Sequence, residues 1–436
     1  MTTDHLYQLF LQNPVISTDT RKIEKDCIFF ALKGDNFDGN LFAGQAIGDG
    51  AAYAVIDDPS QKKSDRFILV EDTLTTLQNL ARYHRKKLNI PFIGITGTNG
   101  KTTSKELINA VLSERYKTYA TKGNLNNHIG VPLTILSITN DIEMAVIEMG
   151  ANHQKEIEFL CSISQPTHGL ITNVGKAHLE GFGSFEGVKK TKGELYEFLA
   201  ANNGIAFINR DNHELVAMSR KTSLEKIIYY GAGADSYING KIMSADPCLK
   251  IKWGKELQEF DDKGNEVSSN LTGTYNLENL LAAITIGTFF NMYPAEINKG
   301  ISSYKPANNR SQIVKTASNT LICDYYNANP SSMIVALENL AAIKAETKAL
   351  ILGDMFELGE ESASEHQLIL EKAISVDAER RIFIGQQFFQ LRSDAAEFFE
   401  TTEAAHKALA ENTIENSTVL IKGSRGMKLE SLIELL

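Results

Sequence analysis

Gly94-Ile-Thr-Gly-Thr-Asn-Gly-Lys-Thr-Thr103 is the stretch of this sequence that decides the fold. A short apolar run, residues 92–95, precedes it, and the segment after it reads as a helix. Glycines in such a loop let successive backbone N–H groups turn toward an anion, and the N-terminus of the next helix adds its dipole. Lys101 would reach the outer phosphates of a nucleotide, and Thr102 offers a hydroxyl to Mg²⁺. The stretch therefore predicts an ATP-binding loop between a strand and a helix.

On the C-terminal side of this loop, apolar runs alternate with helical segments. The runs cover residues 144–148, 168–173 and 204–209. Such alternation is typical of a parallel, doubly wound sheet. A turn-rich stretch of β-structure over residues 228–270 and a helix over residues 276–290 complete this unit. We expect the fold class to be α/β, with a central phosphate-loop ATPase domain built on a parallel sheet.

Two further α/β units flank the central one. Short strands at residues 26–32 and 52–56 are separated by Gly, Asn and Asp turns, and a helix over residues 74–88 leads toward the loop domain. Beyond residue 309, more apolar strands alternate with helices, which indicates a Rossmann-like domain. These strands cover residues 320–323, 349–352, 381–384 and 418–421. For a chain of 436 residues we predict three domains, at 1–88, 89–308 and 309–436.

Composition excludes several classes of protein. The net charge of −10 argues against nucleic acid as a partner, so an anionic ligand must be met by local basic residues. Four cysteines are scattered without C-x-x-C spacing, which favours reduced, cytoplasmic thiols over a zinc site or a disulfide framework. No run approaches the roughly 18 apolar residues of a membrane span. We therefore expect a cytoplasmic protein without membrane insertion.

Three side chains near predicted strand ends and a helix start are candidates for metal chemistry. Glu148 ends the strand over residues 144–148, where a carboxylate can hold Mg²⁺ beside the phosphate loop. His178 follows the strand over residues 168–173, and Lys192 lies in a charged helix start. Taken alone, a single histidine is more often structural, and a run of lysines is equally well a solvated helix face. The phosphate loop in the same sheet favours the metal interpretation for Glu148.

The loop variant resembles that of the Mur ligases and of their relative folylpolyglutamate synthase. Further motifs appear in the order typical of the Mur ligases: Thr121-Lys-Gly-Asn-Leu-Asn-Asn-His-Ile-Gly-Val-Pro132, Glu148-Met-Gly150, Gly273-Thr-Tyr-Asn-Leu-Glu-Asn279, Tyr326-Asn-Ala-Asn-Pro-Ser-Ser-Met333, Leu352-Gly-Asp-Met-Phe-Glu-Leu-Gly359 and Lys422-Gly-Ser-Arg-Gly-Met427. The segments Asp19-Thr-Arg21 and Phe29-Phe-Ala-Leu-Lys-Gly34 resemble the family's uridine-nucleotide module. The resemblance extends over almost the whole chain.

The resemblance implies a site for ATP and two Mg²⁺ ions. ATP would be held by Gly97, Thr98, Asn99, Gly100, Lys101, Thr102, Thr103, Asn276, Asn279, Arg310 and Asp324. Metal ions would be held by Thr102, Glu148, His178 and Lys192, and the catalytic set would be Lys101, Glu148, His178 and Lys192. In several members the lysine matching Lys192 is carbamylated, and we take the same modification here as a hypothesis. The family often has two acidic residues where this chain has Cys323-Asp324, so Asp324 is expected to carry that role.

The motifs also imply an activity: ATP-dependent addition of D-alanyl-D-alanine to UDP-N-acetylmuramoyl-tripeptide through an acyl phosphate. The product would be a peptidoglycan precursor, and the family favours a monomer. Expected substrate-binding residues are Thr20, Arg21, Lys33, Asn124, Asn126, Asn127, Asn327, Asn329, Lys422 and Arg425. The group that accepts the proton of the attacking amine is open among Glu, Asp and His residues of the third domain.

Alternative functions stay open at this stage. The first is a related ligase that adds the third amino acid, or glutamate to folate, although the motifs at 326–333 and 352–359 favour the dipeptide. The second is a non-catalytic nucleotide switch, in which Glu148, His178 and Lys192 would be dispensable. An oxidoreductase is disfavoured, because no G-x-G-x-x-G follows a predicted strand.

Overall fold

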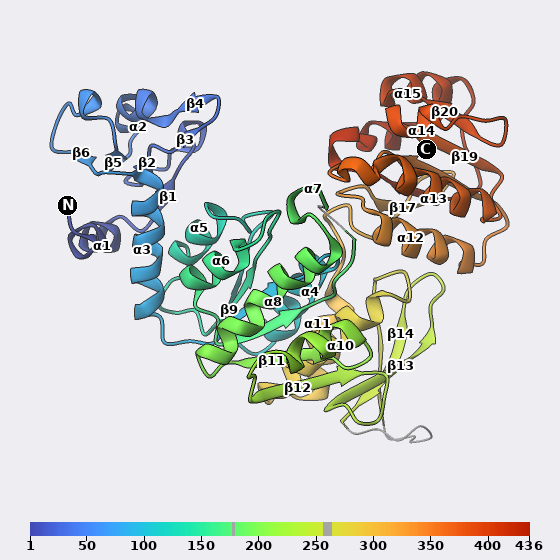
Figure 1. Ribbon diagram of the computed structural model, residues 1–436, viewed down its shortest axis with the longest axis horizontal. Coiled ribbons are helices and arrows are strands. Elements are labelled where there is room, and N and C mark those ends of the chain that lie inside the picture. Colours follow the sequence, from blue (N-terminus) through green and yellow to red (C-terminus); the bar gives the residue numbers. More distant parts are fainter. Residues whose placement is uncertain (177–178, 256–263) are drawn as a thin grey trace.

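The computed structural model describes residues 1–176, 179–255 and 264–436. Three α/β units follow one another, coloured blue, green to yellow and orange to red along the chain in Figure 1. This arrangement, with mainly parallel sheets, confirms the predicted fold class. The domain boundaries after residues 88 and 308 stay a prediction. Among the helices of the described residues, none combines the length and apolar character needed to cross a membrane.

The N-terminal unit is a small parallel sheet attached to the rest of the molecule through one long helix. Its strands, in spatial order, are β1 (Ile16–Ser17), β2 (Ile28–Phe30), β5 (Tyr53–Ile56) and β6 (Phe67–Leu69). The unit also contains α1 (Thr3–Gln12), α2 (Ala43–Gly48) and a hairpin of β3 (Lys33–Gly34) and β4 (Phe37–Asp38).

Helix α3 (Thr73–Lys87) joins this unit to the central one. It begins where the Asp72 side chain accepts a hydrogen bond from the Thr75 amide, and its basic last turn complements the helix dipole. It packs against α5 (Gly130–Leu136) and α6 (Glu156–Ser164) of the central unit. Figure 1 shows α3 standing between the N-terminal sheet and the central domain. The uridine-nucleotide module predicted from sequence is therefore anchored to the ATPase domain along a whole helix.

Within the described residues the central sheet has nine strands, in the order β15-β14-β13-β12-β11-β10-β7-β9-β8. The strands from β8 to β13 are parallel, whereas β14 and β15 add to the edge as antiparallel strands. The turn-rich stretch over residues 228–270 thus extends the central sheet. The strands are β7 (Phe92–Thr96), β8 (Thr118–Ala120), β9 (Met144–Glu148), β10 (His168–Ile171), β11 (Ile205–Asn209), β12 (Lys226–Gly231), β13 (Ile238–Ser244), β14 (Lys250–Gly254) and β15 (Asn265–Ser268).

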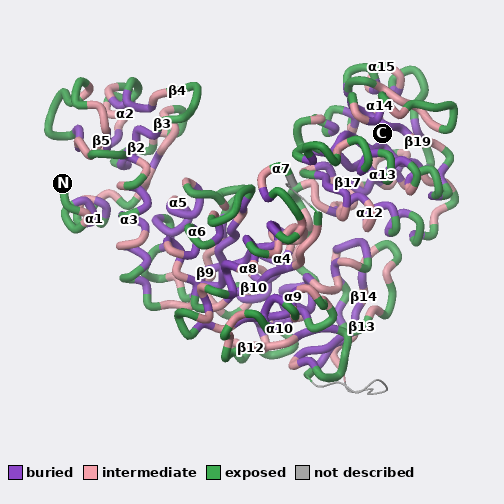
Figure 2. The backbone as a smooth tube through the Cα atoms, viewed as in Figure 1, coloured by how far each residue is buried: buried purple, intermediate pink, exposed green. Residues whose placement is uncertain are grey.

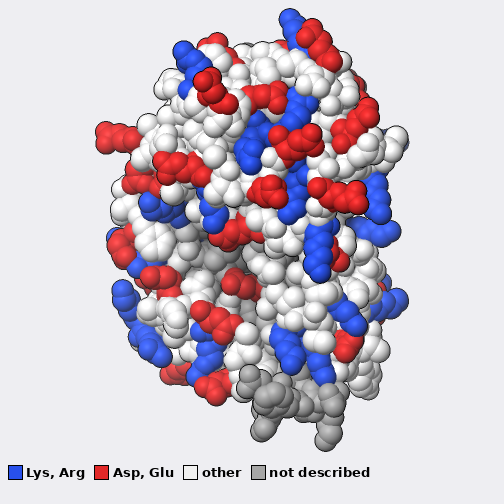
Figure 3. All heavy atoms as spheres, turned by 90° about the vertical axis from the view of Figure 1, so that its right-hand side faces the viewer, with Lys and Arg blue, Asp and Glu red and all other residues white. Residues whose placement is uncertain are grey.

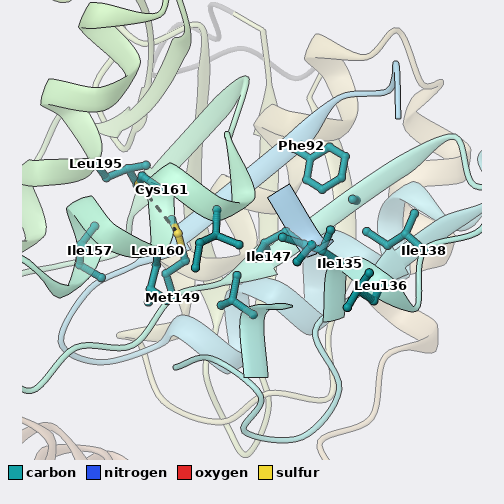
Figure 4. Packing of buried hydrophobic residues seen from close by; sticks show 14 of the residues in the cluster. Phe92, Ile135, Leu136, Ile138, Ile147, Met149, Ile157, Leu160, Cys161 and Leu195 are labelled. Carbon is teal, nitrogen blue, oxygen red and sulfur yellow. Dashed lines mark hydrogen bonds between the residues drawn. The ribbon is translucent and has the colours of Figure 1, made fainter. Parts of the chain in front are cut away.

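Both faces of this sheet are buried, which explains the nearly continuous apolar runs. Successive residues of a strand point to opposite faces, so Ala145 and Ile147 join one core while Met144 and Val146 join the other. Figure 2 shows the strands as a buried layer, and Figure 4 shows Ile147 packed with residues of α5 and α6. The covering helices of this unit also include α4 (Lys101–Leu112), α7 (Leu179–Phe182), α8 (Phe185–Ala201), α9 (His213–Arg220), α10 (Asn276–Phe289) and α11 (Pro294–Ser303).

The C-terminal unit is a six-stranded sheet in the order β16-β17-β21-β18-β19-β20, parallel except for β16. The strands are β16 (Gln312–Lys315), β17 (Thr320–Asp324), β18 (Lys348–Gly353), β19 (Arg380–Ile384), β20 (Glu397–Phe399) and β21 (Thr418–Lys422). Its α-helices are α12 (Pro330–Ala342), α13 (Ser362–Ser375), α14 (Gln386–Gln390) and α15 (Thr402–Glu411). The carboxyl ends of β17, β21 and β18 meet at one edge, where the motifs at residues 324–330, 352–359 and 422–427 come together.

Candidate functional site

The phosphate loop connects β7 to α4, as the sequence predicts. Gly100 caps the helix with a positive φ of 78°, a conformation that suits glycine. At Gly97 a Cβ atom would lie 2.0 Å from the Thr172 hydroxyl, so only glycine fits there. The Lys101 ammonium donates hydrogen bonds to the carbonyls of Gly97, at 2.7 Å, and Thr98, at 3.0 Å. Lys101 is therefore folded onto the rim of the loop, where the phosphates of a nucleotide would sit.

Thr102 and Glu148 form a pair beneath the loop. The Thr102 hydroxyl donates to Glu148 Oε1 at 3.3 Å, and the Asn126 amide donates to the same oxygen at 2.8 Å. The second oxygen, Oε2, is buried and has no hydrogen-bond partner among the residues that the structure describes. A buried, unsatisfied carboxylate oxygen is costly unless a cation or donor meets it. A hydroxyl beside such a carboxylate is a donor set that suits Mg²⁺.

Of the two remaining predicted metal ligands, Lys192 is described, whereas His178 lies outside the described residues. The Lys192 side chain is buried on α8, with its ammonium 5.3 Å from the centre of the Phe182 ring. Burial, reinforced by the charge of Lys101, lowers the pKa of Lys192 to about 7. Near neutral pH a large fraction of this amine is thus uncharged, the form that can react with carbon dioxide.

A cavity of about 840 Å³ joins the central and C-terminal units around the phosphate loop. From the C-terminal side it is lined by Arg310, Asp324, Tyr326, Asn327, Asn329, Lys422 and Arg425. The Arg310 guanidinium stacks on the Tyr326 ring at 3.9 Å, and its Nε–H is buried without a hydrogen-bond partner within residues 1–176, 179–255 and 264–436. An arginine that lines the same cavity as the phosphate loop is suited to an anionic ligand.

The outer surface carries both positive and negative side chains, in contrast to the cations gathered in the cavity. Figure 3 shows Lys and Arg interspersed with Asp and Glu on the side of the C-terminal unit. On this face, attraction of an anion therefore depends on local cations in the cavity rather than on a broad positive surface.

Lys422 and Asp324, which were predicted for different ligands, bind each other. The Lys422 ammonium lies 2.6 Å from Asp324 Oδ2, and Asp324 Oδ1 accepts from the Ser311 amide at 3.2 Å. Lys422 is buried, whereas Arg425 is exposed at the cavity rim, 5.4 Å from the Tyr326 ring. In this arrangement Arg425 is the freer of the two cations for a carboxylate ligand.

Asn276 and Asn279 line the cavity from α10, but their amides are already engaged. The Asn279 Nδ2 donates to Asn276 Oδ1 at 2.8 Å, and Asn279 Oδ1 accepts from the Ser104 hydroxyl at 2.9 Å. Asn276 Nδ2 donates to the Thr272 carbonyl at 2.7 Å. Asn279 therefore holds α10 against the phosphate-loop helix through Ser104, and Asn276 fixes Asn279 and the start of α10; both also line the cavity.

The predicted acceptor loop is also assembled here. Asn124, Asn126 and Asn127 all line the cavity. Asn126 binds Glu148, whereas the Asn127 carbonyl oxygen Oδ1 caps α5 by accepting from the Gly130 amide at 2.9 Å. Asn126 thus links this loop directly to the candidate metal carboxylate.

Thr20, Arg21 and Lys33 lie on the N-terminal unit and do not line the cavity. Arg21 forms a paired contact with Asp19, at 2.9 and 2.8 Å, which lowers the pKa of Asp19 to about 2. Lys33 lies 2.8 Å from Asp57. The structure therefore places these three residues away from the central cavity, on the unit that α3 connects to the central domain.

Asn99 reaches from the phosphate loop to the C-terminal unit. Its Nδ2 donates to the Ser331 hydroxyl at 2.9 Å, and its Oδ1 accepts from Asn329 at 2.8 Å. Its amide N–H donates to Asn173 Oδ1 at 2.9 Å. Ser331 and Asn173 were not singled out from the sequence, although Asn173 ends a predicted strand and Ser331 lies within the motif at residues 326–333. Asn329, predicted to bind substrate, is committed to Asn99 and to capping α12.

We predict that Asn99 and Ser331 are energetically coupled in catalysis. Asn99→Ala and Ser331→Ala should each lower kcat/KM a few-fold. Because both changes remove the same hydrogen bond, the loss in the double variant should be smaller than the sum of the two single losses in free energy, by about 1 kcal/mol. A double-mutant cycle on phosphate release measures this coupling. The exposed Ser375 on α13 serves as control, and its change to alanine should be additive with Asn99→Ala. Additivity in both cycles would contradict the coupling.

A second cavity, of about 630 Å³, lies in the C-terminal unit beside the first. Phe356, Glu357 and Gly426 line both cavities, which makes them the shared wall. The Asp354 carboxylate accepts from the amides of Gln387, at 2.9 Å, and Phe388, at 3.1 Å. Asp354 therefore holds α14 in place, while the exposed Phe356 side chain projects between the cavities.

Comparisons with known proteins agree along the whole chain. Residues 14–97 match the Mur ligase family catalytic domain, residues 95–287 the Mur ligase middle domain, and residues 309–425 the Mur ligase glutamate ligase domain. The UDP-N-acetylmuramoyl-tripeptide--D-alanyl-D-alanine ligase of Bacillus subtilis is 35% identical, with 96% of this chain and 92% of that protein aligned.

Two solved structures are similar over nearly their full length. MurF from Acinetobacter baumannii superimposes with a TM-score of 0.85 at 29% identity, covering 96% of this chain and 92% of that one. The MurF ligase of Thermotoga maritima, determined in complex with ADP, gives a TM-score of 0.84 at 26% identity, covering 98% and 97%.

Proposed function

The chain belongs to the Mur ligase family, and we propose that it joins D-alanyl-D-alanine to UDP-N-acetylmuramoyl-tripeptide with consumption of ATP. The observation that carries this proposal is the shared cavity, which holds a phosphate loop, the Thr102–Glu148 pair and cations of a second domain. Such a cavity can hold a nucleotide and an anionic second substrate together. Peptide-bond formation driven by ATP needs both.

The proposed reaction has two steps, transfer of a phosphoryl group and attack by an amine. The γ-phosphoryl group of ATP passes to the terminal carboxylate of the tripeptide, so that a new P–O bond replaces the bond to ADP. The free amine of D-alanyl-D-alanine then attacks the activated carbonyl, phosphate leaves with the C–O electron pair, and the amine loses one proton. A tripeptide nucleotide becomes a pentapeptide nucleotide, with ADP and phosphate as the other products.

The chain's own residues serve these steps mainly by position and charge. Lys101 turns from the loop carbonyls to the outer phosphates, and the loop amides hold the phosphate chain. Arg310, with its unpaired Nε–H, approaches the transferred group from the C-terminal unit. Asn276 and Asn279 keep α10 at the far end of the cavity, where the base of the nucleotide would lie.

Magnesium fits the residues present. Thr102 and the orphaned oxygen of Glu148 would hold one ion, and Lys192, if carbamylated, would hold a second together with His178. When bound, such ions neutralise the charge that develops on the phosphoryl oxygens.

We place the uridine diphosphate end of the substrate near Thr20, Arg21 and Lys33 on the N-terminal unit. The peptide would extend over α3 and α5 toward Asn126, so that its carboxylate reaches the Thr102–Glu148 pair. The dipeptide would enter through the second cavity, pass the shared wall at Phe356, and place its carboxylate near Arg425, which lines the first cavity. In this assignment ATP and the amine reach the carboxylate of the tripeptide from different cavities.

Carbamylation of Lys192 is a prediction that can be tested apart from turnover. Burial lowers the pKa of Lys192 to about 7, so its neutral, reactive amine is far more populated near neutral pH than that of an ordinary lysine. The amine would add to carbon dioxide, forming an N–C bond and releasing one proton. With ¹³C-bicarbonate, the wild-type protein should give a carbamate NMR signal that Lys192→Met lacks and Lys189→Met retains. Wild-type protein without that signal would contradict the modification.

The decisive test of function is phosphate release by the purified protein with Mg-ATP and UDP-N-acetylmuramoyl-tripeptide. D-Alanyl-D-alanine is added or withheld, and both meso-diaminopimelate and lysine forms of the nucleotide are supplied. Release that requires all three substrates, with a product heavier by the dipeptide less water, is expected. Turnover with a single amino acid and the shorter dipeptide nucleotide would instead identify the neighbouring ligase. ATP binding without turnover would favour a nucleotide switch.

A cytoplasmic location and a monomeric state belong to the same proposal. Both ATP and a sugar nucleotide are substrates of the cytoplasm, and the four cysteines are free thiols. Light scattering in solution would test the monomer.

A further inference from the structure

Lys105 is a fully buried lysine on α4, one helical turn beyond Lys101. It does not line the nucleotide cavity. Burying an ammonium group costs free energy unless hydrogen bonds and a counter-charge compensate it. An apolar residue would fill this helix position without that cost, so the charge calls for a role.

The partners of Lys105 connect two parts of the site. Its ammonium donates to the Thr121 carbonyl at 2.6 Å and lies 2.8 Å from Glu106 Oε1. It is also 4.0 Å from Glu148 Oε2, the oxygen that has no hydrogen-bond partner. Lys105 therefore contacts the start of the acceptor loop and stands behind the candidate metal carboxylate.

Thr121 and Asn126 complete a closed set of contacts around Glu148. The Glu148 amide donates to the Thr121 hydroxyl at 3.0 Å, and the Asn126 amide donates to Glu148 Oε1 at 2.8 Å. The Asn126 carbonyl accepts from the Gly150 amide at 2.8 Å. Residues 122–125, between these two fixed points, are exposed. The loop is thus fastened at both ends, by Lys105 at Thr121 and by Glu148 at Asn126.

We infer that Lys105 is a positioning residue for the proposed ligase reaction, one that ties the acceptor loop and Glu148 to the phosphate-loop helix. The inference rests on the proposed function. Its ammonium fixes Thr121, Thr121 fixes the backbone of Glu148, and the carboxylate is held with Oε1 toward Thr102 and Asn126 and with Oε2 buried 4.0 Å from Lys105. The residue acts through others and touches neither nucleotide nor substrate.

Replacing Lys105 by methionine tests this role, because methionine is an unbranched side chain of similar size that carries no charge. Mn²⁺ binding to the ADP complex, followed by electron paramagnetic resonance, should weaken by about tenfold, the range expected when an outer contact of a metal ligand is lost. In turnover assays, the KM for the sugar nucleotide should rise by a similar factor, while the KM for ATP stays within about twofold, since the phosphate loop is untouched.

The exposed Lys117 gives a matched control, and Lys117→Met should leave all three quantities unchanged. Should Lys105→Met fail to fold, Thr121→Val provides a second test. It removes the hydroxyl that accepts the hydrogen bond of the Glu148 amide, and it should weaken Mn²⁺ binding to a similar extent. Removing a positive charge near Glu148 would by itself strengthen cation binding. Tighter or unchanged Mn²⁺ binding in a folded Lys105→Met would therefore overturn the inference. The Mn²⁺ measurement needs no turnover, so failure of the ligase activity in wild-type protein would be recognised separately.

Discussion

Lys101→Met is expected to lower kcat/KM for phosphate release by on the order of 10³-fold, or about 4 kcal/mol of transition-state stabilisation. In the structure the ammonium is held by the carbonyls of Gly97 and Thr98, which places it at the mouth of the phosphate loop. Its charge would meet the outer phosphates as negative charge is redistributed among them. Steady-state kinetics with all three substrates measures the loss.

The control for this change is Lys86→Met on α3, which removes an exposed lysine and should leave activity intact. Circular dichroism should show the same fold for both variants. Burial lowers the pKa of Lys101 to about 8, so the free protein loses this charge as pH rises through 8. Affinity for ADP should therefore fall above that pH in wild-type protein and stay flat in Lys101→Met. A kcat/KM within tenfold of wild type would contradict the assigned role.

Glu148→Gln should produce the second large effect, a loss of at least about 100-fold in kcat/KM at low Mg²⁺ concentration. The variant keeps the shape of the side chain, but it replaces one carboxylate oxygen by an NH2 group and removes the negative charge. A neutral amide holds Mg²⁺ much less well than a carboxylate. Titration of activity with Mg²⁺ should show a higher half-saturating concentration, and Mn²⁺ binding in the presence of ADP should weaken in parallel.

Glu225→Gln, at an exposed position before β12, is the matched control and should behave as wild type. A structural role for Glu148 would lower thermal stability without changing the Mg²⁺ dependence. Unchanged half-saturation by Mg²⁺ in a folded Glu148→Gln would therefore remove this residue from the metal site. It would also weaken the case for Lys105, whose role depends on Glu148.

Much of the fold was predictable because its signals are local. The strand, glycine loop and helix over residues 92–112 follow from apolar patterning and from glycine conformations, and the structure confirms them as β7 and α4. The strand ending in Glu148 and the strands of the third unit were likewise recognisable as short apolar runs. The order in which the strands pair was harder to predict from the sequence. The stretch over residues 228–270 carries β-propensity, but its antiparallel addition to the central sheet is a long-range contact.

Some contacts among the site residues could also be predicted from the sequence, whereas others could not. Thr102 and Glu148 could be paired from sequence, because parallel strands of one sheet end at the same edge. The ion pair of Lys422 with Asp324 could not, since 98 residues separate them and each had been matched to a different ligand. The contact between Asn99 and Ser331 spans 232 residues and two domains. His178 lies outside the described residues, so its place in the metal site stays a prediction.

The sequence by itself determined the chemistry that this chain can carry: a phosphate loop, a strand-end carboxylate, and a set of motifs whose order identifies the family. These depend on residue type and on spacings of a few residues, which local backbone geometry preserves. Only the tertiary structure decided which polar groups are already satisfied and which are left open. It engages the amides of Asn276 and Asn279, pairs Lys422, and buries Lys105 behind Glu148. Burial and hydrogen-bond satisfaction depend on every neighbour in space, and those neighbours come from all three units of the chain.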